Sequence, residues 1–155
     1  MHRPNRRNLH SIQDSATRAV AAHRALIAAS RENLSALPMV DRVELARVLA
    51  ELDRRGCFEP DVLGAADAVI ARLQAAIARA GGAPVRRWTE QGDGYLVGGT
   101  ETGRRIGCIR DALRRFQREA QAVADRLEAE AWLARRRAAA AGDGVAGDGA
   151  AGDSA

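Results

Sequence analysis

The stretch that decides the fold is IGCIRDALRRFQREAQAVADRL, residues 106–127. Its apolar and small residues recur at alternating steps of three and four positions, which is the spacing of a narrow stripe along one side of a helix. We call this stripe the seam; its members are Ile106, Ile109, Leu113, Phe116, Ala120, Val123 and Leu127. A helix this long is not stable on propensity alone, so the seam must be buried against other parts of the chain. The sequence therefore predicts a long last helix over residues 103–139.

The composition of the whole chain favours an all-α fold. A chain of 155 residues suits one domain with a core of useful size. Apolar residues make up 46% of it, much of this alanine, whereas aromatic residues are only 3%. Small apolar side chains favour closely packed helices over a sheet with bulky faces. We expect a four-helix bundle-like domain with a long connection before a long C-terminal helix.

Three shorter helices are predicted ahead of the seam, over residues 11–36, 41–55 and 61–80. Pro38 ends the first of them, because the residue before a proline disfavours helical geometry. Asp41 and Glu44 have the spacing of a capping box at the start of the second. The short connection between the second and third helices predicts an antiparallel pair. Together with the last helix, these segments define a single helical domain over residues 11–141.

Both ends of the chain are predicted to lie outside this domain. Residues 1–10 are polar and basic, which is typical of a loose terminal arm. Residues 142–155 contain near-repeats of a glycine and aspartate unit, AGDGV, AGDGA and AGDSA. Such small residues cannot bury a core, so we predict a disordered Gly/Ala/Asp tail.

Charge and cysteine content set bounds on function and compartment. All 24 basic residues are arginine, which indicates a codon bias, so the pI near 10.3 is weak evidence for a polyanion partner. The net charge of +4 is ordinary for a small domain. Cys57 and Cys108 do not make a disulfide framework or a metal-binding set. The sequence has neither a secretory signal nor the ~18 apolar residues of a membrane span. We expect a bacterial-type cytoplasmic protein with no cofactor and no metal.

The connection over residues 82–102 is unusually long for a helical bundle. Residues 84–98 have the composition of a β-hairpin, with a turn signal at Gln91-Gly92 and another at Asp93-Gly94. The two signals leave the register open. A two-stranded hairpin is only marginally stable alone, so we expect it to lie on the bundle or on a partner.

The approach to the last helix resembles a phosphate-binding loop in its spacing alone. Gly98 and Gly103 are separated as in the G-x-x-x-x-G of a P-loop. The Lys and Ser/Thr that follow in a true P-loop are replaced by Arg104 and Arg105, which argues against nucleotide hydrolysis. Free N–H groups at a helix start beside two arginines would still suit a simple anion.

Two surfaces are candidates for function. The first is basic and contains aromatic residues able to stack on bases, and residues 84–118 hold eight arginines against four acids. Its predicted anion or nucleic-acid contacts are Arg86, Arg87, Trp88, Tyr95, Arg104, Arg105, Arg114 and Arg118. The second is the end of the last helix, which outruns the shorter helices and carries Leu127, Trp132 and Leu133 as a predicted partner interface.

The sequence shows no Ser/His/Asp or Cys/His arrangement, so we expect a protein that is not an enzyme. A DNA-binding helix-turn-helix over residues 41–80 is rejected, because its second helix opens with DVLGAADAV and offers no Arg, Asn or Gln to the bases. The predicted function is a non-catalytic interaction or assembly protein that self-associates or binds a protein partner through its last helix. The alternative is a nucleic-acid-binding protein that uses the Arg86–Arg118 surface.

Overall fold

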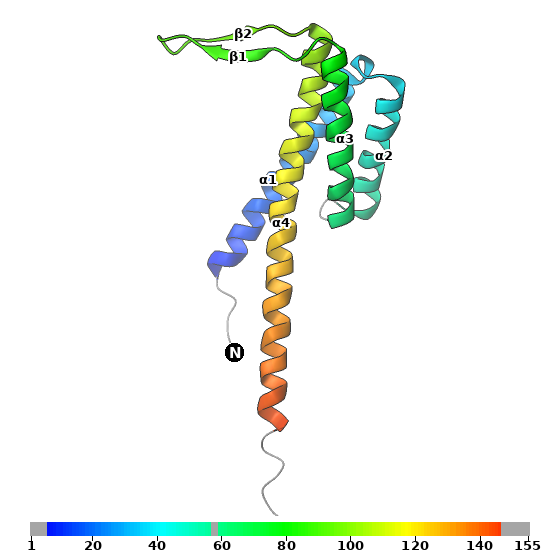
Figure 1. Cartoon of the computed structure of the whole chain (residues 1–155). Coiled ribbons are helices and arrows are strands. Elements are labelled where there is room, and N and C mark those ends of the chain that lie inside the picture. The colour runs from blue at the N-terminus through cyan, green and yellow to red at the C-terminus, as the bar shows by residue number, and fades with distance from the viewer. Residues whose placement is uncertain (1–5, 57–58, 147–155) are drawn as a thin grey trace, which may run out of the picture.

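A computed structural model describes residues 6–56 and 59–146 of the chain (Figure 1). The elements follow in the order α1 (Arg6–Asn33), a short 3-10 turn η1 (Leu34–Ala36), α2 (Met39–Arg55), α3 (Pro60–Arg79), β1 (Val85–Trp88), β2 (Gly94–Val97) and α4 (Glu101–Ala146). The predicted fold class, a helical bundle-like domain with a hairpin before a long last helix, is confirmed.

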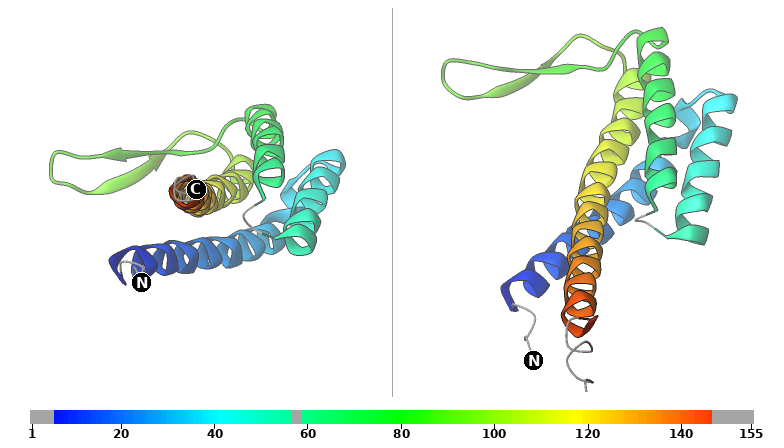
Figure 2. Two further views of the ribbon diagram at one scale, coloured as in Figure 1. Left: turned by 90° about the horizontal axis from the view of Figure 1, so that it is seen from below. Right: turned by 60° about the horizontal axis from the view of Figure 1, so that its bottom comes forward.

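The helix α4 is the element on which the others are assembled. Both α1 and α3 pack directly against α4, whereas α2 packs against α3 (Figure 2). The chain directions alternate. Arg105, near the start of α4, donates to Asn33 at the end of α1. Arg18, earlier in α1, forms an ion pair with Glu119, which lies later in α4. The helices therefore lie in the order α1, α4, α3, α2, each antiparallel to its neighbour.

Burial of the seam confirms the sequence pattern as far as Val123. Six of its seven residues are almost completely buried, and only Leu127 is exposed. The side chains that cover the seam come from α1, including Ala22 and Leu26, and from α3, including Leu73. Phe116 is the largest fully buried side chain, and its ring centroid lies 5.5 Å from that of His23 on α1. The core thus sits where α1 and α3 meet on α4.

The second half of α4 continues without cover from the rest of the bundle. Every residue from Asp125 to Asp143 is exposed. In Figure 1 this part of α4 extends well past α2 and α3, and the first turns of α1 diverge from it. The helix reaches Ala146, beyond the predicted end at residue 139.

The helical boundaries at the ends of the chain differ from the predicted ones. The first helix begins at Arg6 rather than Ser11, because neither glycine nor proline interrupts the chain between Arg6 and Asn33. Residues 142–146, predicted as part of the tail, belong to the last turns of α4. Residues 1–5 of the predicted arm and 147–155 of the predicted tail lie outside the described residues.

The predicted capping box of α2 is wrong. The helix begins at Met39 with Pro38 at the N-cap, so Asp41 lies inside the first turn. Its side chain is buried, and each of its two oxygens lies 3.7 Å from an arginine of α3, Arg72 or Arg79. A buried carboxylate requires such partners, and an acid in the first turn also suits the helix dipole. Asp41 therefore links α2 to α3 instead of capping α2.

We predict that replacing Phe116 by alanine lowers the free energy of unfolding by about 3–5 kcal/mol, because a buried aromatic side chain leaves a cavity when it is truncated. Urea denaturation followed by circular dichroism measures the change. Val43→Ala, an exposed position on α2, is the control and changes stability by less than ~0.5 kcal/mol. Equal effects of the two substitutions would contradict the assignment of Phe116 to the core.

Candidate interaction surfaces

The hairpin register places the two predicted stacking residues on opposite faces. Trp88 pairs with Gly94, and Arg87 pairs with Tyr95. Cross-strand partners share a face of a sheet, and successive residues along a strand alternate between faces. Trp88 therefore shares its face with Arg86, and Tyr95 shares the other with Arg87. The two aromatic rings do not form one stacking platform.

The turn of the hairpin spans Thr89–Gly92, with Glu90 and Gln91 at its centre, and so uses the Gln91-Gly92 signal. The N–H of Gly92 donates to the carbonyl of Thr89 at 3.0 Å, and the N–H of Thr89 donates to the carbonyl of Asp93 at 2.9 Å. Gly92 has φ of 85°, a left-handed conformation that glycine adopts without steric cost. This closing pattern, a tight turn followed by a left-handed glycine, is a common hairpin loop and decides between the two turn signals of the sequence.

The hairpin is an arm that projects from the bundle. All eight of its strand residues are exposed, and Figure 1 shows it extending sideways from the junction of α3 and α4. The hairpin therefore does not lie on the bundle, and of the two expected supports the partner stays a prediction. The guanidinium carbon of Arg86 lies 5.5 Å from the centroid of the Trp88 ring, which is a cation–π contact.

Thr100 fixes the base of the arm to the bundle. Its hydroxyl donates to the carbonyl of Ala80 at the end of α3 (2.6 Å) and accepts from the N–H of Gly103 in the first turn of α4 (3.0 Å). Its own N–H donates to the carbonyl of Gly82 at 3.1 Å. Thr100 is therefore the N-cap of α4 and joins the start of α4 to the end of α3.

The glycines with P-loop spacing permit close approach between these two segments. A Cβ added to Gly103 would lie 1.9 Å from the carbonyl oxygen of Gly82, and one added to Gly99 would lie 2.4 Å from the nitrogen of Pro84. Gly98 and Gly99 also have positive φ values, 70° and 71°. The glycines that resemble a phosphate loop are thus required because residues 82–84, which lead into the hairpin, pass close to Gly99 and Gly103 at the start of α4.

Both arginines at the start of α4 are engaged within the chain. Arg105 donates to the carbonyl of Glu32 and to the hydroxyl of Ser35, each at 2.9 Å, and so binds the C-terminal end of α1. Arg104 donates to the carboxylate of Glu101 at 2.9 Å. This hydrogen bond lowers the pKa of Glu101 and raises the pKa of Arg104. An anion at this helix start would compete with these contacts for both side chains.

The predicted nucleic-acid contacts are therefore spread over three places: the arm, the start of α4 and the middle of α4. Arg114 and Arg118 lie on the middle of α4 and are exposed. Within residues 6–56 and 59–146, no carboxylate lies at ion-pair distance from either of them. The arm and the middle of α4 thus keep arginines available for a polyanion, while the start of α4 does not.

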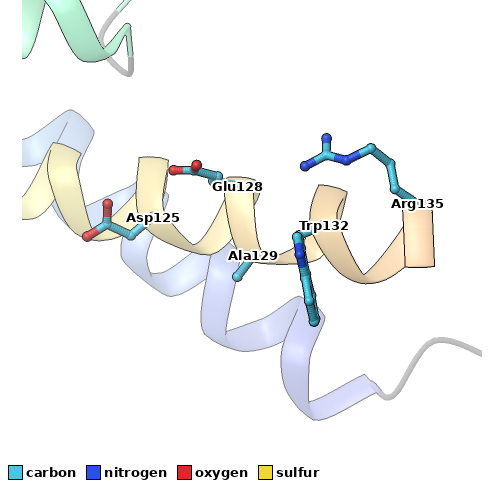
Figure 3. A pocket seen from close by; sticks show the side chains of 5 residues that line it. All are labelled: Asp125, Glu128, Ala129, Trp132 and Arg135. Atoms are coloured by element: carbon cyan, nitrogen blue, oxygen red, sulfur yellow. The ribbon is translucent and has the colours of Figure 1, made fainter. Parts of the chain in front are cut away.

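The predicted partner interface lies on the uncovered end of α4. Leu127, Trp132 and Leu133 are 47%, 50% and 42% exposed. Leu127 and Trp132 are five positions apart, which is about 140° around a helix, so they point to different sides. Trp132 borders an open hollow of about 410 Å³ that is also lined by Asp125, Glu128, Ala129 and Arg135 (Figure 3). The guanidinium of Arg136 lies 5.2 Å from the Trp132 ring centroid.

Other chemically notable side chains do not gather into a site. His23 is partly buried, and its Nε2 lies 3.9 Å from the carboxylate of Asp53. Cys108 is exposed, and Cys57 lies outside the described residues. No three His, Cys, Asp or Glu side chains of the described segments lie close enough to hold a metal ion.

Comparison with known proteins leaves the function to be inferred from the chain itself. No protein-family model, curated protein or solved structure matches the chain. Among the helices that the structure describes, none has the length and apolarity to cross a membrane. The geometry of the hairpin arm and of the α4 end therefore carries the functional assignment.

We predict that Gly103→Ala lowers the free energy of unfolding by about 1–3 kcal/mol, since the new methyl group would overlap the carbonyl of Gly82 and force a backbone shift. Gly64→Ala is the matched control. Gly64 lies inside α3 with open space at the Cβ position, so the same substitution stabilises by roughly 0.5–1 kcal/mol. Urea midpoints of both variants test this, and a Gly103→Ala protein as stable as Gly64→Ala would exclude the close approach.

Proposed function

We propose that this protein is a non-catalytic assembly protein that self-associates through the exposed end of α4. The observation that carries the proposal is the uncovered helix from Asp125 to Asp143, which presents Trp132 and Leu133 to solvent. A helix in water is stabilised mainly by packing of an apolar face, and this segment is exposed and extends past α2 and α3 (Figure 1). A second copy of the chain would supply the missing packing.

The residue types on this segment suit a protein interface. Tryptophan and arginine are enriched among the residues that dominate binding energy, and Trp132 and Arg136 already stack on one another. Burial of apolar area contributes roughly 25 cal/mol for each Å² removed from water. Leu133 is adjacent to Trp132, whereas Leu127 continues the line of the seam and lies about 140° around the helix from Trp132, outside a contact centred on that ring.

We predict that Trp132→Asp abolishes self-association, because it places a charge where the apolar ring is buried in the assembly. Light scattering across a concentration series measures the mass. The wild-type protein exceeds the monomer mass of 16.5 kDa as concentration rises, and Trp132→Asp stays at that value. Val43→Asp, which alters an equally exposed apolar residue on α2, is the control and associates as the wild type does. A wild-type protein that remains monomeric when concentrated would rule out the proposal.

The hairpin arm supports nucleic-acid binding as a second candidate function. A two-stranded β-ribbon fits the major groove of a duplex, and the arm carries Arg86 and Arg87 on its two faces. In the described part of the chain, no carboxylate lies at ion-pair distance from either arginine. Trp88 and Tyr95, one on each face, would contact opposite walls of a groove or of a single strand.

We predict that Arg86→Gln with Arg87→Gln reduces the dependence of DNA affinity on salt, by about one unit of slope for each phosphate that the arm no longer neutralises. Fluorescence anisotropy with a short duplex at two or more salt concentrations measures the slope. Arg114→Gln with Arg118→Gln removes the same charge from α4, and a smaller effect of this pair places the DNA-binding surface on the arm. Absence of any binding at low salt would eliminate this second function.

A further inference from the structure

We infer that two copies of the chain pair the ends of their α4 helices antiparallel, with the two-fold axis at Trp132. This inference rests on the proposed self-association and adds its orientation, its register and the pairs of residues that meet. It concerns one side of α4 between residues 118 and 143, which we call the Trp132 stripe. Its members lie within about 60° of Trp132 around the helix: Arg118, Gln121, Asp125, Glu128, Ala129, Trp132, Arg135, Arg136, Ala139 and Asp143.

The Trp132 stripe is free to receive a second helix. All its members are exposed, and Figure 3 shows Asp125, Glu128, Ala129 and Arg135 around the hollow beside Trp132. Val123, the last buried residue of the seam, lies nine positions before Trp132, which is about 180° around the helix. The stripe therefore points away from the side on which the seam is packed against α1 and α3, and all its side chains are exposed.

Charges on the stripe change sign at Trp132. Asp125 and Glu128 precede the ring, and Arg135 and Arg136 follow it. In an antiparallel pair centred on residue 132, a residue that precedes Trp132 in one copy lies level with the residue that follows Trp132 by the same number of positions in the other copy. Glu128 and Arg135 lie on the same side of the stripe, so Glu128 of one copy then meets Arg135 of the second copy. Asp125 and Arg136 face each other in the same way on the other side, and the reverse pairs form by symmetry. A parallel pair in register would set Glu128 against Glu128 and Arg135 against Arg135, which is repulsive.

The outer parts of the stripe repeat this complementarity. In the antiparallel arrangement, Asp143 of one copy lies opposite Gln121 and within one helical turn of Arg118 in the second copy. Ala146 is 14 positions past Trp132, a length of about 21 Å, so the end of each helix reaches the level of Arg118 of the other. The two cores, packed on residues 106–123 of each α4, then lie toward opposite ends of the paired helices.

The centre of the contact has the shape that close helix packing requires. Trp132 lies on the two-fold axis, where the ring of each copy covers the ring of the other. Ala129 and Ala139 flank it on the stripe and let the two backbones approach. Arg136 already lies over the Trp132 ring within its own chain, so its guanidinium is positioned beside the axis before the copies meet. Gln121 donates to Asp125 at 2.8 Å, which also orients this carboxylate on the stripe.

Charge reversal at the central pair tests the register. Glu128→Arg gives a chain with two basic residues at the paired positions 128 and 135, and Arg135→Glu gives a chain with two acidic ones. Each variant alone meets only like charges, so we expect its dimer dissociation constant to rise by about tenfold or more. An equimolar mixture restores the dimer, because a basic chain and an acidic chain match at both pairs. Analytical ultracentrifugation measures the affinity, and native mass spectrometry shows one chain of each kind in the dimer.

Matched controls keep the charge changes but move them to the other side of the helix. Glu130→Arg and Arg137→Glu lie about 140–160° from Trp132 and leave the wild-type affinity unchanged. Circular dichroism verifies that all four variants remain helical. A wild-type protein that is monomeric at high concentration overturns both the proposed function and this inference. The antiparallel register alone is overturned if the wild type dimerises but Glu128→Arg and Arg135→Glu leave its affinity unchanged. It is also overturned if mixing these two variants does not restore the dimer, or if the control variants weaken it equally.

Discussion

Burial of the α4 seam between α1 and α3 is the interaction on which the rest of the structure depends. The helices α1 and α3 both pack on α4, and α2 is attached mainly through α3, with Asp41 held between two arginines. The hairpin arm also takes its position from α4, because Thr100 caps that helix while holding the end of α3. The cover ends at Val123, although the helix continues to Ala146. This mismatch between the length of the helix and the length of its cover creates the surface that we assign to assembly.

Features set by neighbouring residues along the chain could be predicted from the sequence. The seam, the three earlier helices and the presence of a hairpin follow from local periodicity and turn signals, and all of them are found. The exposed end of α4 followed from comparing helix lengths. The faces of the hairpin could not be predicted, because a turn signal does not fix the number of residues in the loop, and a pairing shifted by one residue exchanges the faces. Only the hydrogen bonds around Gly92 decide that Trp88 and Tyr95 are opposed.

Features that depend on contacts distant in sequence were mistaken for local motifs. The spacing of Gly98 and Gly103 resembles a phosphate loop, but Gly103 is required by the carbonyl of Gly82, which lies 21 positions earlier in the chain. Arg105 resembles an anion ligand in sequence and binds the end of α1 in the fold. Asp41 resembles a cap and instead pairs with α3. In each case a polar or flexible residue, suited to a ligand, serves to join two segments of the same chain.

Cover of the α4 end by another molecule of the same chain is the central claim. Amide hydrogen exchange along α4, measured in dilute and in concentrated protein, tests it most directly, because exchange reports local opening residue by residue. We predict that residues 106–123 are equally protected in both samples. We also predict that residues 127–143 gain protection as concentration rises, with the largest gain around Trp132. Rapid exchange of residues 127–143 at every concentration would contradict the claim.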